Sequence, residues 1–227
     1  LPTARLRVTG TLKEGSSALP FDEDQREEFS TLIGRRAVWL AASTHPGEEE
    51  AAARAHREVL RRAPRTLLIL VPRHPDRGSD IAAGLREAGW RVAQRSKDED
   101  LRLDTEIYLA DTLGELGLWY RLAPISFVGG SLMPIGGHNP FEPAALGSAI
   151  LHGPNVANFK DIYDRLTKSH ASRPVHSDKE LAAAVVDLLA PDRVAEMAHA
   201  AWETCSAGAE VTDEAIELVF DSIGAVP

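Results

Sequence analysis

Apolar segments and helical repeats alternate along most of this chain. Six short segments are typical of strands, namely "AVWLAAS", "TLLILVP", "RVAQ", "EIYLAD", "ISFVGG" and "AILHG", which begin at residues 37, 66, 91, 106, 125 and 149. Most of them are continuous apolar runs rather than alternations of apolar and polar residues. Such runs are typical of parallel strands that are covered on both faces.

Helices are predicted before, between and after these strands. In "DEDQREEFSTLIG", Asp22 is placed to cap a helix and Gly34 to end it. Further helices are expected over residues 47–62, 79–90 and 113–123, from residue 141, and after Pro174 to the end of the chain. Strands that alternate with helices predict an α/β fold: a doubly wound, Rossmann-like parallel sheet of about six strands with a helical C-terminal end.

Composition and charge exclude several classes of protein. The 227 residues are 44% apolar, which is enough for a sizeable core. The formal net charge of -9 argues against a nucleic-acid partner, because phosphate-backbone binding needs a basic surface. The single cysteine, Cys205, excludes an internal disulfide. No apolar run approaches the length that spans a bilayer.

Four polar segments marked by glycine or proline follow predicted strands. They are residues 43–47, 72–75, 111–115 and the loop "GGSLMPIGGHNPFEPAALG" at 129–147. Carboxyl ends of parallel strands share one edge of a sheet, where α/β proteins bind ligands. Each of the first three segments also has a structural interpretation. Ser43 and Thr44 could cap a helix, with the acidic residues 48–50 at the positive end of its dipole, Arg73 and His74 could lie in a solvated loop, and residues 111–115 could form another cap.

The loop at 129–147 favours a ligand site instead. It holds five glycines and three prolines in nineteen residues, and a helix start follows its second Gly-Gly pair. Glycine backbone and the free amides of a helix start together favour an anion. A phosphate is expected on the glycine backbone and near Asn139, with Arg73 as its cation and Glu142 as an acceptor for ribose hydroxyls.

Several familiar motifs are absent from the sequence. It has neither the G-x-G-x-x-G fingerprint nor a P-loop, and no Ser nucleophile elbow. The eight histidines show no zinc-binding spacing, so no metal is expected. The roles of His45, His74 and His138 stay open, with loop hydrogen bonds favoured over proton transfer.

Four motifs in order carry a family resemblance. "WLAASTHPGEEE", "LLILVPRHPDR", "DTLGELGLWY" and "FVGGSLMPIGGHNPFEPAALG" resemble the C-terminal domain of 3-deoxy-D-manno-octulosonic acid (Kdo) transferases, which are GT-B glycosyltransferases. The resemblance runs from about residue 7 to near the C-terminus. It implies transfer of Kdo from CMP-Kdo to a lipid A precursor in lipopolysaccharide biosynthesis.

The resemblance also implies a donor site. Its CMP-contacting segments match Pro72, Arg73, Leu113, Gly114, Glu115, Asn139, Pro140, Phe141 and Glu142. Flanking motifs hold Ser43, Thr44, Gly129, Gly130, Ser131, Gly136 and Gly137. No metal or other cofactor is expected beside the CMP-Kdo donor.

The rest of such an enzyme is expected outside this chain. The family's catalytic carboxylate and acceptor site belong to an N-terminal domain with a membrane anchor, so no catalytic residue is expected here. Residues 1–15 are predicted to be an interdomain linker or strand, and residues 16–227 the donor-binding domain. The parent protein is expected at the cytoplasmic face of the bacterial inner membrane. The present chain is expected to be soluble, to bind CMP and to be inactive alone.

Three alternatives stay open from the residues. The chain could be the donor domain of another GT-B enzyme that uses a UDP-sugar, or a non-catalytic nucleotide-binding module. A helical interaction module built on the last fifty residues is the weakest alternative, because those helices are expected to close the core. Residues 211–223 are expected to pack loosely.

Overall fold

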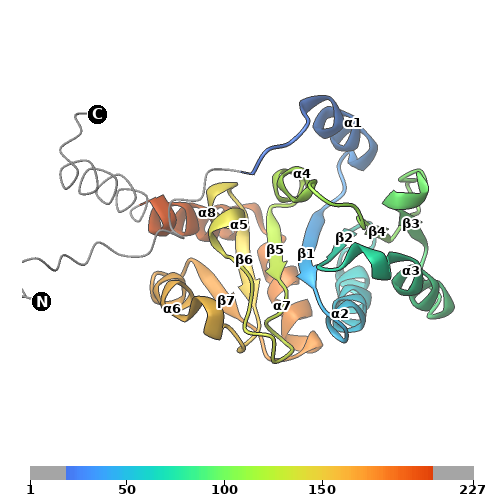
Figure 1. Cartoon of the computed structure of the whole chain (residues 1–227). Helices are drawn as coiled ribbons and strands as arrows, with labels where there is room; N and C mark the ends of the chain where they lie inside the picture. Colours follow the sequence, from blue (N-terminus) through green and yellow to red (C-terminus); the bar gives the residue numbers. More distant parts are fainter. Residues whose placement is uncertain (1–18, 207–227) are drawn as a thin grey trace, which may run out of the picture.

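A seven-stranded parallel sheet forms the centre of the protein (Figure 1). The structure is a computed structural model that describes residues 19–206, so the expectations for residues 1–15 and 211–223 lie outside the described residues. The strands are β1 Val38–Thr44, β2 Leu67–Pro72, β3 Val92–Gln94, β4 Ile107–Leu109, β5 Ile125–Val128, β6 Ala149–His152 and β7 Ser172–Pro174. All six neighbouring pairs are parallel. The predicted doubly wound α/β fold is confirmed, with one strand more than expected.

The strand order contains one topological switch. Across the sheet the order is β3-β4-β2-β1-β5-β6-β7. From β1 the chain first builds the side that holds β2, β4 and β3, and it then returns to add β5 beside β1. In open α/β sheets, ligands bind outside the carboxyl ends of the two strands at such a switch. Here these strands are β1 and β5.

Helices cover both faces of the sheet. They are α1 Glu23–Ile33, α2 Glu48–Arg62, α3 Gly78–Glu87, α4 Leu116–Leu122, α5 Phe141–Ala145, α6 Lys160–Lys168, α7 Asp178–Leu188 and α8 Pro191–Ser206, with 3-10 turns η3 Pro75–Arg77, η4 Arg95–Lys97 and η5 Ala157–Phe159. Apolar residues of α2, α3 and α7 pack on one face. On the other face, α1 and α4 pack over one half of the sheet, and α5, α6 and part of α8 over the other half.

Alternation along β1 shows how the two faces separate. Trp39 and Ala41 belong to the cluster under α2, whereas Val38, Leu40 and Ala42 belong to the cluster under α1 and α4. Side chains of successive strand residues point to opposite faces, so a strand in a middle layer needs apolar residues at every position. This requirement produces the uninterrupted apolar runs seen in the sequence.

The ends of the first two helices differ in how well the sequence predicts them. The Asp22 side chain caps α1 by accepting from the Gln25 amide at 3.1 Å, and Gly34 ends this helix with φ 61°, as expected. The interpretation of Ser43 and Thr44 as caps of α2 is wrong. Thr44 is the last residue of β1, and Gly47 precedes α2 without a side-chain capping bond.

Neither α6 nor β7 was predicted from the sequence. The β7 segment is only Ser-Arg-Pro, which has neither an apolar run nor alternation. It pairs with β6 through residues 150–152 at the sheet edge, so its position follows from tertiary packing. No helix among the described residues combines the length and apolar character that crossing a membrane requires.

Candidate functional site

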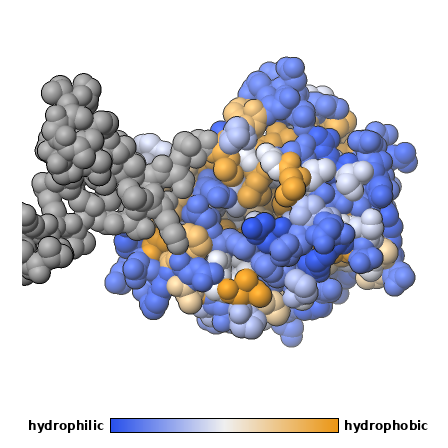
Figure 2. All heavy atoms as spheres, viewed as in Figure 1, coloured by the Kyte–Doolittle hydropathy of each residue, from blue (hydrophilic) through white to orange (hydrophobic). Residues whose placement is uncertain are grey.

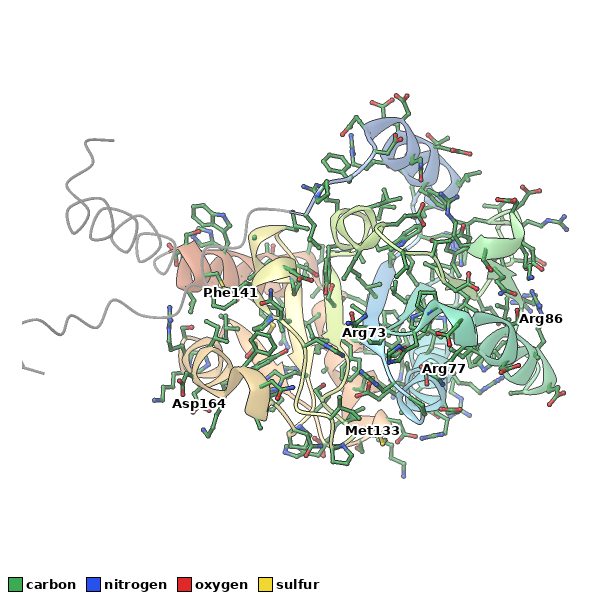
Figure 3. The ribbon with its side chains drawn as sticks, viewed as in Figure 1. Arg73, Arg77, Arg86, Met133, Phe141 and Asp164 are labelled. Atoms are coloured by element: carbon green, nitrogen blue, oxygen red, sulfur yellow. The ribbon has the colours of Figure 1, made fainter. Side chains whose placement is uncertain are left out.

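The carboxyl ends of β1, β2 and β5 bring several of the predicted site residues together. Pro72 is buried at the end of β2, and Arg73 follows it with an exposed side chain. The Arg73 amide donates to the Thr44 carbonyl at 2.9 Å, which ties the end of β2 to the end of β1. In Figure 3, Arg73 lies near the middle of the view, between Phe141 on one side and Arg77 on the other. Most of the residues visible on this face are hydrophilic (Figure 2).

Close backbone contact between β1 and β5 explains the first glycine of the loop. The Gly129 amide donates to the Ala42 carbonyl at 2.8 Å. A Cβ atom at Gly129 would lie 2.5 Å from the Ser43 carbonyl oxygen, closer than real Cβ contacts. Only glycine therefore permits this approach. Ser43 itself adopts a left-handed conformation with φ 55°.

The buried carboxylate of Glu48 accepts hydrogen bonds from the backbone amides that follow Gly129. Glu48 is the first residue of α2 and has no exposed surface. Its carboxylate accepts the backbone N–H groups of Gly130 at 2.7 Å, Ser131 at 3.0 Å, Leu132 at 2.8 Å and His45 at 3.0 Å. Four such bonds compensate a buried charge. The phosphate expected on the glycine backbone therefore does not find the amides of Gly130 and Ser131 free.

Ser131 and the second glycine pair fasten the loop further. The Ser131 hydroxyl accepts the Gly153 amide at 2.8 Å, which joins the loop to the end of β6. Gly136 and Gly137 have φ of 108° and 78°, a region that favours glycine. The Gly137 amide donates to the Gly130 carbonyl at 2.7 Å. These two glycines thus close the loop upon itself.

The segment after the loop carries Glu142 toward Arg73. The Asn139 side chain accepts the Phe141 amide at 3.0 Å and donates to Glu142 Oε1 at 3.3 Å. Phe141 is buried in the cluster under α5 and α6, and Pro140 is buried before it. Burial raises the pKa of the Glu142 carboxyl, while Asn139 and the charge of Arg73 oppose this rise. Arg73 therefore lies within electrostatic reach of Glu142.

Residues 113–115 lie farther along the same edge. They follow β4, and β2 separates β4 from β1. The Leu113 side chain is 79% exposed, and Gly114 is exposed with φ 84°. Glu115 forms an ion pair with Arg95 at 2.7 Å. Burial raises the pKa of the Glu115 carboxyl, but hydrogen bonds from Arg95 and Thr112 outweigh it and lower the pKa.

Three histidine rings meet at the switch. The Nε2 atoms of His45 and His138 are 2.9 Å apart, and the planes of the two rings differ by 10°. The His74 ring meets His45 edge-on at 5.7 Å between centroids. Burial lowers the pKa of both His45 and His138, to about 4 for His138. The described residues contain no cluster of three or more His, Cys, Asp or Glu side chains suited to a metal ion.

Comparisons with known proteins identify the family. The chain is 35% identical over 196 residues to the 3-deoxy-D-manno-octulosonic acid transferase of Haemophilus influenzae, and the match covers 83% of the chain and 44% of that protein. Against the Bordetella pertussis transferase the identity is 34%, over 96% of the chain and 52% of that protein. The crystal structure of the C-terminal CMP-Kdo binding domain of WaaA from Acinetobacter baumannii superposes with a TM-score of 0.75 at 31% identity, over 80% of the chain and 96% of that domain.

This chain belongs to the Kdo transferase family. It spans about half the length of the curated Kdo transferases that it matches. A scan against protein-family models gave no match. The GT-B fold that the sequence resemblance implied is confirmed by the same superposition.

Two features of this Kdo transferase domain were missed by sequence reasoning. Glu48 was interpreted only as a partner of a helix dipole, because an acidic first turn is common in helices. Three of its four amide partners lie 82 to 84 positions away, so no local pattern could indicate them. The His45–His138 pair likewise joins residues 93 positions apart.

Proposed function

We propose that this chain is the donor-binding domain of a Kdo transferase and binds CMP-Kdo outside the carboxyl ends of β1, β2 and β5. The observation that carries the proposal is the placement of Arg73 and Glu142. They come from the end of β2 and from α5, yet the charge of Arg73 acts on the Glu142 carboxyl. A cation beside a carboxylate at a topological switch suits a nucleotide, because the cation can pair with the phosphate and the carboxylate can accept hydrogen bonds from the ribose hydroxyls.

Several of the predicted residues then have a role in the donor site. Arg73 pairs with the phosphate through its guanidinium, and Glu142, held by Asn139, accepts hydrogen bonds from the ribose hydroxyls. Gly129 and Gly130 allow the loop backbone to pass close to β1, and they do not donate their amides to the nucleotide. Residues 113–115 extend the site along the edge beyond β2.

The reaction of the whole enzyme is part of the same proposal. The parent protein transfers Kdo from CMP-Kdo to a lipid A precursor in lipopolysaccharide biosynthesis, at the cytoplasmic face of the inner membrane. The acceptor site and the catalytic carboxylate come from outside the half of the enzyme that this chain represents. The domain therefore binds CMP without transferring Kdo, and it uses no metal.

Calorimetric titration with CMP, UDP and NAD tests this proposal. We expect CMP to bind more tightly than UDP, and NAD not to bind. Arg73→Ala and Glu142→Ala should each weaken CMP binding by about 1.5–3 kcal/mol, the usual loss for a charge-assisted hydrogen bond. Arg86→Ala is the matched control, because Arg86 lies on α3 and pairs with Glu99 at 2.6 Å.

Three outcomes would contradict parts of the proposal. Equal binding of UDP and CMP would favour a GT-B enzyme that uses a UDP-sugar. Unchanged CMP binding in both site variants would place the nucleotide elsewhere. Kdo transfer by this chain alone would contradict the assignment of the catalytic base to another part of the enzyme.

A further inference from the structure

A phosphate at the switch needs donors other than the loop amides. Glu48 takes the N–H groups of Gly130, Ser131 and Leu132, and the Gly137 amide is bonded within the loop. A second anion cannot share these donors without displacing a fully buried carboxylate. These four amides are thus occupied, and side chains at the same edge can supply donors in their place. At the ends of β1, β2 and β5 such side chains include Arg73 and the three histidines.

The hydrogen bond between His45 and His138 fixes what the pair presents. One Nε2 donates and the other accepts, so the accepting ring is neutral and carries its proton on Nδ1. Within the described residues, the Nδ1 atoms of His45 and His138 make no hydrogen bond. Both rings are only partly buried. The neutral pair thus offers one N–H donor and one lone pair, and after gaining one proton it offers two N–H donors.

We propose that the His45–His138 pair binds the phosphate of the nucleotide and takes up a proton when that phosphate becomes a free monoester. This inference rests on the proposed function, because it assumes a cytidine nucleotide at the switch. During transfer the bond between the sugar and a phosphate oxygen breaks, and its electron pair stays on that oxygen. The sugar passes to the acceptor hydroxyl oxygen, whose proton leaves through the catalytic carboxylate of the rest of the enzyme, and the proton of the histidine pair comes from solvent.

The charges around the pair favour this proton uptake only when an anion is bound. Burial, Arg73 and His74 all oppose protonation of His45 and His138, and His45 also opposes protonation of His138. Glu48 favours protonation of both rings, and Glu49 favours that of His45, but they do not outweigh the other groups. The pKa of His138 is accordingly lowered to about 4. A phosphate monoester brings nearly two negative charges to the same place, which reverses the balance.

Calorimetry in two buffers measures this proton directly. We would titrate the chain with CMP and with cytidine at pH 7.5, in Pipes and in Tris, whose heats of ionisation differ. CMP should bind with uptake of a measurable fraction of a proton, and cytidine with none. At this pH most CMP is already the dianion, since the second pKa of a phosphate monoester is about 6.

Conservative variants test whether the proton is taken up by His45 and His138. His138→Asn keeps a donor near the place of Nδ1, and His45→Gln keeps one near Nε2, but neither side chain can be protonated. Each should abolish proton uptake and weaken CMP binding about tenfold, the equivalent of 1.4 kcal/mol, while leaving cytidine binding unchanged. His176→Asn is the control, because His176 is exposed and pairs with Glu180. Thermal unfolding checks that every variant folds.

The outcomes separate this inference from the proposed function. CMP binding without proton uptake, or uptake that persists in both histidine variants, overturns the inference alone. Absence of CMP binding by the unmodified chain overturns the inference and the proposed function together. Loss of uptake in the variants with cytidine binding intact supports both.

Discussion

The Gly130 amide donates to the carboxylate of Glu48 at 2.7 Å, across 82 positions of the chain. This bond joins the start of α2 to the loop after β5. Three further backbone amides donate to the same buried carboxylate, which holds the loop after β5 in place against the start of α2. The loop therefore has a defined shape before any nucleotide binds.

Glu48→Ala should destabilise the protein strongly. The substitution leaves four backbone N–H groups without their acceptor, and a buried unsatisfied donor costs about 1–3 kcal/mol. We expect a total loss of about 3–5 kcal/mol in the free energy of unfolding, measured with urea, as for other buried charges that lose their partners. Glu50→Ala is the matched control, since Glu50 lies in the same helical turn but is exposed. Equal effects of the two substitutions would contradict the role of Glu48.

Gly129→Ala and Gly84→Ala should change stability in opposite directions. A Cβ atom at Gly129 collides with the Ser43 carbonyl oxygen, whereas one at Gly84 meets nothing within 4 Å. We expect Gly129→Ala to lower the thermal midpoint. Gly84 lies inside α3, so alanine there should add about 0.5–1 kcal/mol through helix propensity. A midpoint that Gly129→Ala leaves unchanged would show that β1 and β5 can separate without cost.

His56 should make stability depend on pH. The Trp39 indole N–H donates to His56 Nδ1 at 3.0 Å, and His56 Nε2 lies 3.0 Å from the Glu106 carbonyl, so the ring is held neutral. Burial lowers its pKa to about 3, below the ordinary value of 6.5. Between these values the unfolded chain binds the extra proton, and stability therefore falls as the pH falls below 6.5.

Urea unfolding at several pH values tests this dependence. From this one group we expect a loss of about 1.4 kcal/mol for each pH unit below 6.5, down to about pH 3. His56→Gln should reduce this slope, even if it lowers stability at neutral pH. His199→Gln is the comparison, because His199 is exposed on α8. An identical slope in the His56 variant would disprove the assignment.

Arg77 should matter more to stability than Arg61. Arg77 pairs with Glu49 at 2.8 Å, and the Glu49 side chain is only 2% exposed. Arg77→Ala leaves this carboxylate without its cation, which should cost about 3 kcal/mol in chemical denaturation. The pair of Arg61 with Glu58 is exposed on both sides, and Arg61→Ala should change little. Similar effects of both substitutions would place Glu49 in contact with water.

The fold could be predicted from the sequence because the apolar pattern of each strand reflects the burial of that strand in the sheet. The runs at β1, β2 and β5 are apolar at nearly every position, as strands buried on both faces require. It also predicted which segments share the edge with Arg73, since parallel strands place their carboxyl ends together. It missed β7, whose three residues carry no pattern of their own.

The sequence by itself determined the layered α/β architecture and the edge that holds Arg73 and Glu142, because hydrophobic periodicity and strand direction are local properties. Only the tertiary structure decided which donors that edge offers. Residues far apart in the chain form the decisive hydrogen bonds: the loop amides donate to Glu48, and His45 bonds to His138. Such contacts depend on how the chain returns to β1 from the other side of the sheet, and no short segment encodes that return.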